Sequence, residues 1–397
     1  MMLYDFIDIE LRKLKGKGTY RTISVSETPQ EPRIRINNKE CILLCSNNYL
    51  GLANNPKVKQ AAIRAIERYG VGSGASRLVS GSIKPHRQLE ERLAGFKGTE
   101  DAIVFNSGYH ANLGVISALA GRGDVIFSDK LNHASIVDAC ILSRAKIRRY
   151  PHRDIDTLER FLKTASHTPL SGDTTHHASR KLIVTEGVFS MDGDIAPLKE
   201  ILNLAEHYGA MVMVDDAHAT GVLGENGRGT LEHLGIINMD NVIQMGTLGK
   251  AIGSFGAFVT GSKKLINYLI NKSRTFIYTT ALPPSVCAAS IAAIDVIENE
   301  PELRQELFKK VSYFRRGLKD ASIDVMSEES HIIPAFIGDS KKTEEVSRKL
   351  LEKGIFIQGI RPPTVKEGTA RLRITLMATH EWEDLKYAIE IIKGIIK

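Results

Sequence analysis

The middle of this 397-residue chain alternates short apolar runs with amphipathic stretches, and this alternation limits the folds open to it. Six runs rich in apolar and β-branched residues are expected to be strands: 101–105, 124–129, 181–189, 210–217, 241–247 and 256–262. Helical spacing of apolar residues separates several of them, as in residues 196–209. Apolar strands joined by helices are typical of a parallel sheet covered on both faces. We therefore expect an α/β protein with a mostly parallel sheet.

The pattern changes on either side of this region. Residues 1–45 indicate an amphipathic helix, a basic loop and a short hairpin, which together form an N-terminal arm. Beyond residue 285, charged amphipathic helices alternate with strand-like runs, including 355–360, which is typical of a smaller α+β domain. The predicted division is a 1–45 N-terminal arm, a 46–285 large domain and a 286–397 small C-terminal domain.

Charge and composition restrict the partners. The chain is 43% hydrophobic and 25% charged, which is typical of a soluble globular protein. Its net charge of +7 comes from dispersed basic residues, with only short clusters such as 12–17. This favours a solvated basic surface or an anionic small-molecule substrate, and not nucleic acid.

Cysteine spacing and hydropathy indicate a cytoplasmic protein without a metal site. The chain has four cysteines: Cys41, Cys45, Cys140 and Cys287. They lack metal-ligand spacing and are expected to be reduced thiols. The first residues do not resemble a secretory signal, and no apolar run approaches the roughly 20 residues that cross a bilayer, so no membrane contact is expected. His176 and His177 lie in a polar, turn-rich stretch and are interpreted as loop residues.

Polar or ionisable side chains follow five of the predicted strands. They lie in the segments 106–110, 130–133, 190–193, 215–218 and 247–250. Because ligands of open α/β sheets bind beyond the carboxyl ends of the strands, these segments are expected to share one site. Each has a structural interpretation by itself, since Ser107 can cap the following helix and Asp215 can cap a turn. Their joint occurrence favours a functional site.

Lys250 stands alone among glycines and small apolar residues in "MGTLGKAIG", residues 245–253. Asp215 adds a carboxylate, and His133 and His218 add imidazoles. The helix that begins after Ser107 offers free N–H groups to a phosphate. Pyridoxal 5'-phosphate (PLP) requires these groups: an amine for its Schiff base, an acid beside its pyridine nitrogen, a ring to stack on and a phosphate seat. The sequence therefore predicts a PLP site.

Long ordered motifs support this prediction. They lie at 45–56, 70–82, 133–139, 185–198, 214–229 and 246–253. At these residues the sequence resembles the α-oxoamine synthases, PLP enzymes of fold type I, and the resemblance covers nearly the whole chain. It implies an aspartate aminotransferase-like large domain with a smaller α+β domain.

The resemblance also implies a role for each cofactor residue. Lys250 binds PLP, Asp215 pairs with the pyridine nitrogen, and His133 stacks on the ring. His218 hydrogen-bonds the phenolic oxygen, near which Ser190 also contacts the cofactor. The first four of these residues are the implied catalytic residues. The implied phosphate side is lined by Gly108, Tyr109 and Thr247.

Further residues are assigned by the resemblance alone. Thr279 and Thr280 correspond to a segment that reaches the partner subunit's phosphate, which implies a homodimer. Arg21 corresponds to a substrate-contacting arginine, and Thr364 is a candidate substrate contact. Either Arg371 or Arg373 would bind the amino acid carboxylate through a bidentate pair of hydrogen bonds. The family pattern favours Arg371.

The C-terminal stretch 359–380 narrows the reaction. It resembles the members that condense L-alanine with pimeloyl-CoA in biotin synthesis, releasing CoA and CO2. Whether the acyl donor is a CoA or a carrier-protein thioester stays open, as does the length of the acyl chain. The glycine- and acetyl-CoA-using members are the alternative.

Two other classes are weighed against this reading. A PLP site by itself does not choose a reaction, so an aminotransferase or an amino acid lyase on the same fold is a competing hypothesis. A non-catalytic subunit of an oligomeric acyltransferase is the other. Such subunits lack the lysine, so Lys250 together with Asp215 and His218 argues against it.

Overall fold

The computed structural model describes residues 4–165, 179–237 and 242–396. They divide into two compact units. The sheet unit comprises 54–189 and 195–301, and the terminal unit comprises 1–53, 190–194 and 302–397. These boundaries differ from the sequence-based division at 45 and 285. Helix α11 (Pro284–Asn299) packs against α2 (Pro56–Tyr69) and α3 (Lys84–Lys97), so it belongs with the sheet.

The sheet unit contains a seven-stranded sheet in the order β3-β9-β8-β7-β6-β4-β5. Its strands are β3 (Asp101–Phe105), β4 (Val125–Asp129), β5 (Lys146–Tyr150), β6 (Lys181–Glu186), β7 (Met211–Asp215), β8 (Val242–Thr247) and β9 (Ala257–Gly261). Only β9 runs against its neighbours, because β3 and β8 both pair with it antiparallel while the remaining pairs are parallel. The expected α/β fold with a mostly parallel sheet is confirmed.

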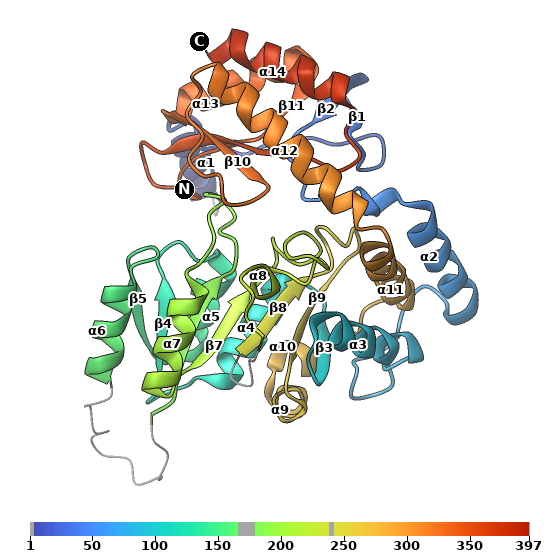
Figure 1. Cartoon of the computed structure of the whole chain (residues 1–397), viewed down its shortest axis with the longest axis vertical. Coiled ribbons are helices and arrows are strands. Elements are labelled where there is room, and N and C mark those ends of the chain that lie inside the picture. The colour runs from blue at the N-terminus through green and yellow to red at the C-terminus, as the bar shows by residue number, and fades with distance from the viewer. Residues whose placement is uncertain (1–3, 166–178, 238–241, 397) are drawn as a thin grey trace. The chain divides into compact units, whose positions relative to one another are not determined.

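Alternate strand residues feed two cores on opposite faces of this sheet. One core joins Ile126, Val184 and Met213 to α4 (Gly108–Leu119), α5 (Ala134–Ser143), α9 (Lys263–Lys272) and α10 (Arg274–Ile277). The other joins their chain neighbours Phe127, Ile183 and Val214 to α6 (Ile155–Ala165), α7 (Leu198–Tyr208) and α8 (Thr230–His233). Figure 1 shows the sheet with these helices around it. The period-two change of face explains why the strands read as continuous apolar runs.

The terminal unit holds two three-stranded sheets, β1-β2-β11 and β10-β13-β12. Their strands are β1 (Arg33–Ile36), β2 (Lys39–Leu43), β10 (Ile332–Gly338), β11 (Ile355–Phe356), β12 (Gly359–Ile360) and β13 (Ala370–Thr375). Four helices accompany them: α1 (Asp5–Gly16), α12 (Glu302–Asp320), α13 (Ser340–Glu352) and α14 (Trp382–Ile396). The expected helix and hairpin of the N-terminal arm are confirmed. The single strand expected over 355–360 is wrong, because its two halves pair with different sheets.

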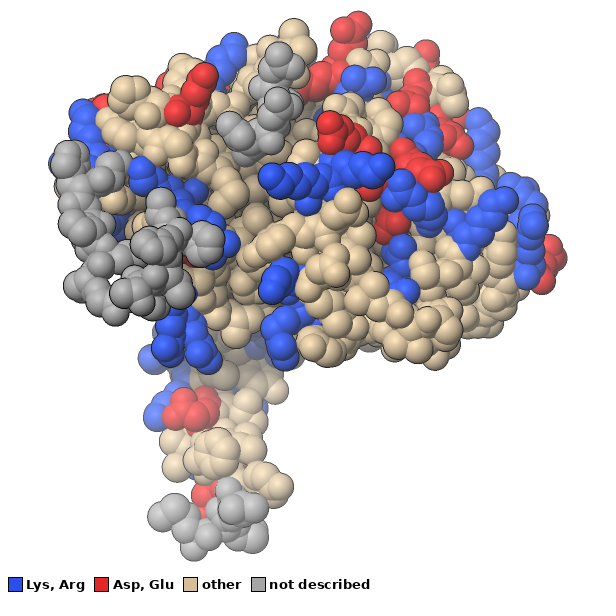
Figure 2. Space-filling view, turned by 90° about the horizontal axis from the view of Figure 1, so that it is seen from below, with Lys and Arg blue, Asp and Glu red and all other residues tan. Residues whose placement is uncertain are grey.

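Three further expectations concern the paired histidines, membrane-spanning segments and the distribution of basic side chains. His176 and His177 lie outside the described residues. Across the ranges that the structure covers, no helix is both long enough and apolar enough to cross a membrane. On the face shown in Figure 2, Lys and Arg side chains lie among acidic and other side chains, not in one continuous patch.

Candidate active site

The carboxyl ends of β3, β4, β6, β7 and β8 lie at one edge of the seven-stranded sheet, because these strands run in the same direction. Four of the five predicted segments that follow these strands belong to the sheet unit and emerge at this edge. The fifth segment, 190–193, follows β6 and belongs to the terminal unit.

Lys250 lies in a tight loop between β8 and β9. Leu248 and Ile252 anchor this loop in the core, with 0% of each exposed. The Thr247 hydroxyl donates to the Gly256 carbonyl across the loop, at 3.0 Å. Gly253 has φ +68°, a conformation that favours glycine, and its N–H donates to the Lys250 carbonyl. The packed loop fixes the backbone from which the Lys250 side chain extends.

The Lys250 amine is in contact with one of the predicted histidines. Its Nζ lies 2.8 Å from Nε2 of His218, which follows β7. An amine and an imidazole at this distance can exchange a proton or share one. Lys250 and His218, which follow the neighbouring strands β8 and β7, thus meet in space.

Asp215 ends β7 as a buried carboxylate, 5% exposed. Its Oδ1 accepts from the Ala217 backbone N–H at 3.1 Å, and its Oδ2 accepts from the Asn112 side-chain amide at 2.8 Å. Asp215 forms no ion pair with any described residue, although a buried carboxylate is costly without a cation. A protonated pyridine nitrogen would supply that missing charge, so this residue fits PLP.

A chain of hydrogen-bonding contacts leads from Asp215 to His133. Asn112, on α4 and 1% exposed, donates to Ser135 Oγ at 2.9 Å as well as to Asp215. Ser135 Oγ lies 2.8 Å from His133 Nδ1, which also accepts the Ser135 backbone N–H at the start of α5. The contacts fix the orientation of the His133 ring relative to the buried carboxylate. Sequence reasoning missed Asn112 and Ser135, although a polar residue inside the apolar run of α4 was a usable signal.

The surroundings of His133 lower the pKa of its imidazole below the ordinary 6.5. Desolvation is the largest cause, although more than a third of the residue is accessible. The Lys250 amine also lowers this pKa, whereas Asp215 and Asp138 raise it. A neutral imidazole is the form that stacks on an aromatic ring without adding a charge.

The N-terminus of α4 is the place where the sequence predicts a phosphate seat. Ser107 caps the helix by accepting from the His110 N–H, which leaves the first N–H groups without an acceptor in the helix. A Cβ at Gly108 would lie 3.1 Å from the Met245 methyl, so glycine suits the close approach to β8. The Tyr109 hydroxyl donates to the Asp138 carboxylate, and this bond raises the pKa of Tyr109. Free N–H groups at a helix start fit a phosphate group.

Asn106, which follows β3, forms hydrogen bonds with Thr279 and Thr280. Its side-chain amide donates to Thr279 Oγ1 at 3.0 Å and to the Thr280 carbonyl at 2.9 Å. Thr280 also forms an isolated bridge with Ser76. The two threonines are thus held beside the end of β3, and Thr280 is exposed.

A buried ion pair supports the loop that carries His218. Lys97 Nζ lies 3.0 Å from Asp216 Oδ2, and each side chain is 1% exposed. Asp216 also accepts from the backbone and hydroxyl of Thr230. No space is left beside it, since a Cβ at Gly229 would lie 1.7 Å from Asp216 Oδ2. Asp216 therefore acts as a structural anchor directly after Asp215, and its partner Lys97 was not expected from the sequence.

Two arginines of β13 lie beside the 190–194 segment in the terminal unit. Arg371 pairs with Asp192 Oδ1 at 2.7 Å and donates to the Met191 carbonyl. Arg373 donates to the Ser190 carbonyl, to Asn47 Oδ1 at 3.2 Å and to the Tyr49 hydroxyl at 3.3 Å. Arg373 has no carboxylate partner among the described residues. Of the two guanidiniums, Arg373 has the unneutralised charge.

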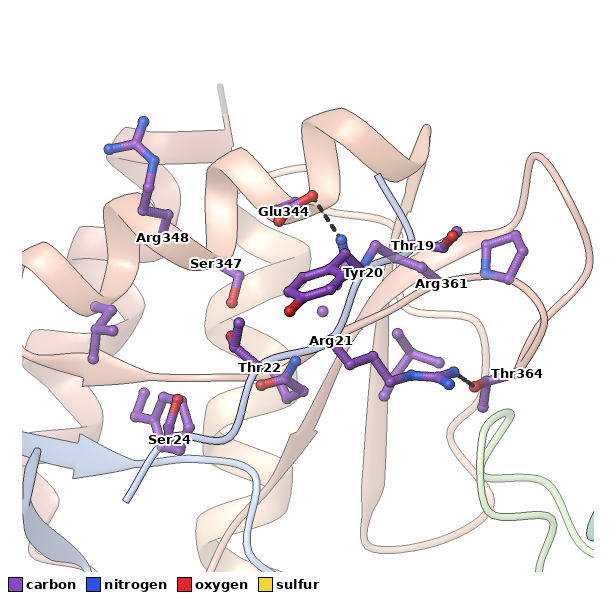
Figure 3. A pocket seen from close by; sticks show the side chains of 16 residues that line it. Thr19, Tyr20, Arg21, Thr22, Ser24, Glu344, Ser347, Arg348, Arg361 and Thr364 are labelled. Carbon is purple, nitrogen blue, oxygen red and sulfur yellow. Dashed lines mark hydrogen bonds and ion pairs between the residues drawn. The ribbon is translucent and has the colours of Figure 1, made fainter. Parts of the chain in front are cut away.

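Arg21 and Thr364 meet at a cavity of about 550 Å³ within the terminal unit. The Arg21 Nη2 donates to Thr364 Oγ1 at 3.3 Å, and Figure 3 shows the guanidinium reaching the hydroxyl from the N-terminal segment. The lining mixes polar and apolar side chains, with Tyr20 and Ser347 among its hydroxyl groups. Two residues 343 positions apart, assigned to substrate separately, thus form one contact.

Comparison with known proteins gives consistent relatives. The family model for class I and II aminotransferases matches residues 39–392. An 8-amino-7-oxononanoate synthase from Geotalea daltonii is 55% identical, over 97% of this chain and 96% of its own. A serine palmitoyltransferase variant from S. paucimobilis, solved with a bound PLP–myriocin aldimine, is 34% identical over 99% of this chain and 97% of its own, with a TM-score of 0.90. The 8-amino-7-oxononanoate synthase of Francisella tularensis is 31% identical over 89% of this chain and 97% of its own, with a TM-score of 0.75.

The chain belongs to the class I and II aminotransferase family, and its relatives place it among the α-oxoamine synthases. The family and the fold-type I fold expected from the motifs are both confirmed.

Proposed function

We propose that this chain has 8-amino-7-oxononanoate synthase activity, the decarboxylative condensation of L-alanine with a pimeloyl thioester in biotin biosynthesis. The observation that carries the proposal is the full-length identity of 53–55% to relatives of that name, combined with a site that fits PLP. The protein is a PLP-dependent transferase.

The cofactor residues are proposed from the geometry of the sheet unit. Lys250 would hold PLP covalently, with Asp215 at the pyridine nitrogen and the start of α4 at the phosphate. His133 would stack on the ring, and His218, 2.8 Å from the amine, would reach the phenolic oxygen. PLP bound there acts as an electron sink for the α-carbon of the amino acid.

Proton transfer falls to Lys250 once the amino acid is bound. Its Nζ is the proposed base that removes the α-proton of alanine, and it later returns a proton to the product carbon. His218 Nε2 is close enough to hold the amine in position between these steps. His133 is a proposed hydrogen-bond donor to the thioester carbonyl, where negative charge develops during attack.

The amino acid carboxylate requires a guanidinium, and two are available. The family pattern favours Arg371, and this choice stays a prediction. The contact of Arg371 with Asp192 already neutralises its charge, whereas Arg373 carries hydrogen bonds to neutral groups alone. We therefore propose Arg373 as a second candidate, with Asn47 beside it. A bidentate guanidinium contact suits either residue.

The acyl chain is proposed to end at Arg21 and Thr364. Pimeloyl thioesters carry a distal carboxylate, which a guanidinium and a hydroxyl can bind together. The Arg21 guanidinium and the hydroxyl groups in the cavity suit this charged end better than the methyl end of an acetyl or palmitoyl chain. The donor can be a CoA or a carrier-protein thioester, and the basic net charge of +7 suits either anion.

A homodimer in the cytoplasm completes the proposal. Thr279 and Thr280 lie at the sheet unit's surface, beside Asn106, where a partner's phosphate site could use them. The assignment is motivated by the resemblance of this segment to one that reaches the partner subunit's phosphate in the family.

The deciding experiment gives PLP-loaded protein each combination of alanine, glycine or serine with pimeloyl-CoA, acetyl-CoA or palmitoyl-CoA. CoA release and product mass are followed together. Product formed only from alanine and pimeloyl-CoA is the expected result. Turnover of glycine with acetyl-CoA would instead indicate glycine C-acetyltransferase activity. Conversion of the amino acid to a 2-oxo acid, with pyridoxamine phosphate formed and no CoA released, would indicate an aminotransferase.

A further inference from the structure

We propose that Arg361 is a positioning residue that fastens the N-terminal segment 18–24 across the terminal-unit cavity and thereby holds Arg21 beside Thr364. The inference rests on the proposed function, because Arg21 is taken to contact the distal carboxylate of the acyl donor. It assigns the N-terminal arm a role in substrate selection.

Arg361 follows β12 and binds two acceptors from distant parts of the chain. Its Nη1 donates to the Gly18 carbonyl at 2.6 Å and to Glu344 Oε2, on α13, at 2.7 Å. The Arg361 side chain is 12% exposed, so these bonds are partly shielded from water. Figure 3 shows Glu344 and Arg361 joined above the cavity. Hydrogen bonds from a buried guanidinium are stronger than those between neutral groups.

Gly18 is suited to this attachment. Its φ of +65° lies in the region that favours glycine, and it turns the chain directly after α1. A Cβ at this position would lie 3.6 Å from Glu344 Oε2 and 3.7 Å from Lys341 Cγ, so the turn packs against α13. The carbonyl of Gly18 is thus presented to Arg361 by a backbone shape that few other residues adopt.

The segment beyond Gly18 has little else to hold it. Residues 20–24 form no backbone-to-backbone hydrogen bond with any described residue, and Ile23 is 94% exposed. The next attachment is the bridge between Ser26 and Ile36 of β1. The Arg21–Thr364 contact is long and exposed, so it contributes little by itself. The position of Arg21 therefore depends on the attachment at Gly18.

One turn carries both ends of the arrangement. The Thr364 N–H donates to the Arg361 carbonyl at 3.1 Å, which closes a four-residue turn. Arg361, at the start of this turn, donates to the Gly18 carbonyl, and Thr364, at its end, accepts from Arg21. A shift of the segment at Gly18 would therefore move Arg21 relative to Thr364.

The charges around the cavity single out Arg21. Glu344 neutralises Arg361, and Arg348 pairs with Glu352 on α13. Among the described residues, Arg21 is the cavity arginine without a carboxylate partner. It is available for an anionic substrate group once the segment is held in place.

The test compares Arg361→Ala and Arg361→Lys with Arg12→Ala, which removes an arginine of α1 that donates to the Asp8 carbonyl of the same helix. Limited trypsin digestion of the PLP-loaded enzyme follows cleavage after Lys17 and after Arg21 by mass spectrometry. This measurement needs no substrate. The kinetic measurement follows KM for pimeloyl-CoA and, separately, the change in cofactor absorbance when alanine binds.

The expected result is faster cleavage at both sites in Arg361→Ala and a KM for pimeloyl-CoA raised about 10- to 100-fold, with kcat changed less. Alanine binding should stay unchanged, Arg361→Lys should recover part of the loss, and Arg12→Ala should match the wild type. Unchanged cleavage in Arg361→Ala would overturn the attachment. Faster cleavage with an unchanged KM would overturn its link to the substrate. A wild type inactive with every acyl-CoA would refute the proposed function, while the digestion still decides the attachment.

Discussion

Lys250 is the residue on which the whole cofactor assignment depends. Replacing Lys250 with Ala removes the only amine proposed to hold PLP covalently, and with it the proposed base. We expect the absorbance of covalently held cofactor to disappear and turnover to fall by at least about 10³-fold. Absorbance spectra of the PLP-treated variant, before and after gel filtration, check this. A retained covalent band would exclude Lys250.

Asn112 is a residue whose importance only the structure shows. Its amide donates to Asp215 and to Ser135 from a position that is 1% exposed. Asn112→Leu keeps a similar volume but removes both donors, so the buried carboxylate keeps a single backbone donor. We expect a PLP dissociation constant raised at least about 10-fold, because an unmade bond to a buried charge costs about 1–3 kcal/mol. Fluorescence titration of the apoprotein with PLP measures it.

Ser135→Ala is the matched control for that change. It leaves the Asn112–Asp215 bond intact and removes the Ser135 hydroxyl, which accepts from Asn112 and contacts His133 Nδ1. We expect a smaller change in PLP affinity than in Asn112→Leu. Equal losses in the two variants would contradict a specific role of Asn112 toward Asp215.

Substitutions of the two arginines of β13 can show which of them binds the amino acid carboxylate. Arg373→Lys loses the fork geometry at a guanidinium without an acid partner, so KM for alanine should rise at least about 10-fold. Arg371→Lys retains a charge beside Asp192 and should have the smaller effect. Steady-state kinetics with varied alanine decide between them, and the reverse order would restore the choice made from the sequence.

Among the elements, the best predicted are helices with clear end signals. Asn55 caps α2, and Gly70 ends it with φ +79°. Gly209 ends α7 in the left-handed conformation. These signals are local, because a cap or a glycine stop involves residues only a few positions apart.

Strand β5 was missed for a physical reason. It lies at an edge of the sheet and reads "KIRRY", with a single buried residue, Tyr150. Charged side chains protect an edge strand from pairing with another chain, and they also hide it from a search for apolar runs. The 355–360 stretch was misread for another reason. Its two halves pair with β2 and β13, which are distant in sequence, so the local pattern does not show the division.

The buried His380, which connects the end of β2 to the residues after β13, should make the stability of the fold decrease at low pH. His380, 1% exposed, accepts the Met377 N–H at Nδ1 and donates to the Leu43 carbonyl from Nε2. Burial is the main cause that lowers its pKa from 6.5 to about 4, with Lys310 also lowering it and Asp384 opposing. The unfolded chain therefore binds a proton first, and stability falls as pH drops from about 6.5 to about 4.

The size of this loss follows from the pKa difference. The free energy of unfolding falls by roughly 3 kcal/mol across this pH range, because each unit of difference between the unfolded and folded pKa corresponds to about 1.4 kcal/mol. His380→Asn offers an acceptor and a donor without a titrating ring, so its own stability should depend less on pH in this window. Urea unfolding of both proteins between pH 4 and 7 measures the difference. Parallel pH profiles would show that His380 does not contribute.

At the level of the whole molecule, we expect a homodimer with shared sites. Light scattering should give about twice the chain mass of 43.8 kDa. A Lys250→Ala chain mixed with a Thr279→Val, Thr280→Val chain should regain activity, because one site of the hybrid combines an intact lysine with intact threonines. A monomeric mass, or a mixture no more active than its parts, would contradict the shared site.

The sequence by itself determined the α/β class, six of the seven strands of the central sheet, and the residues that follow the strand ends. Those features depend on periodicity and on short motifs, which the chain carries locally. The tertiary structure alone decided which side chains meet. Asn112 and Asp215 are 103 residues apart, and Arg361 and Gly18 are 343 apart. Such contacts depend on strand order, register and helix packing, because only these bring distant polar groups within hydrogen-bond distance.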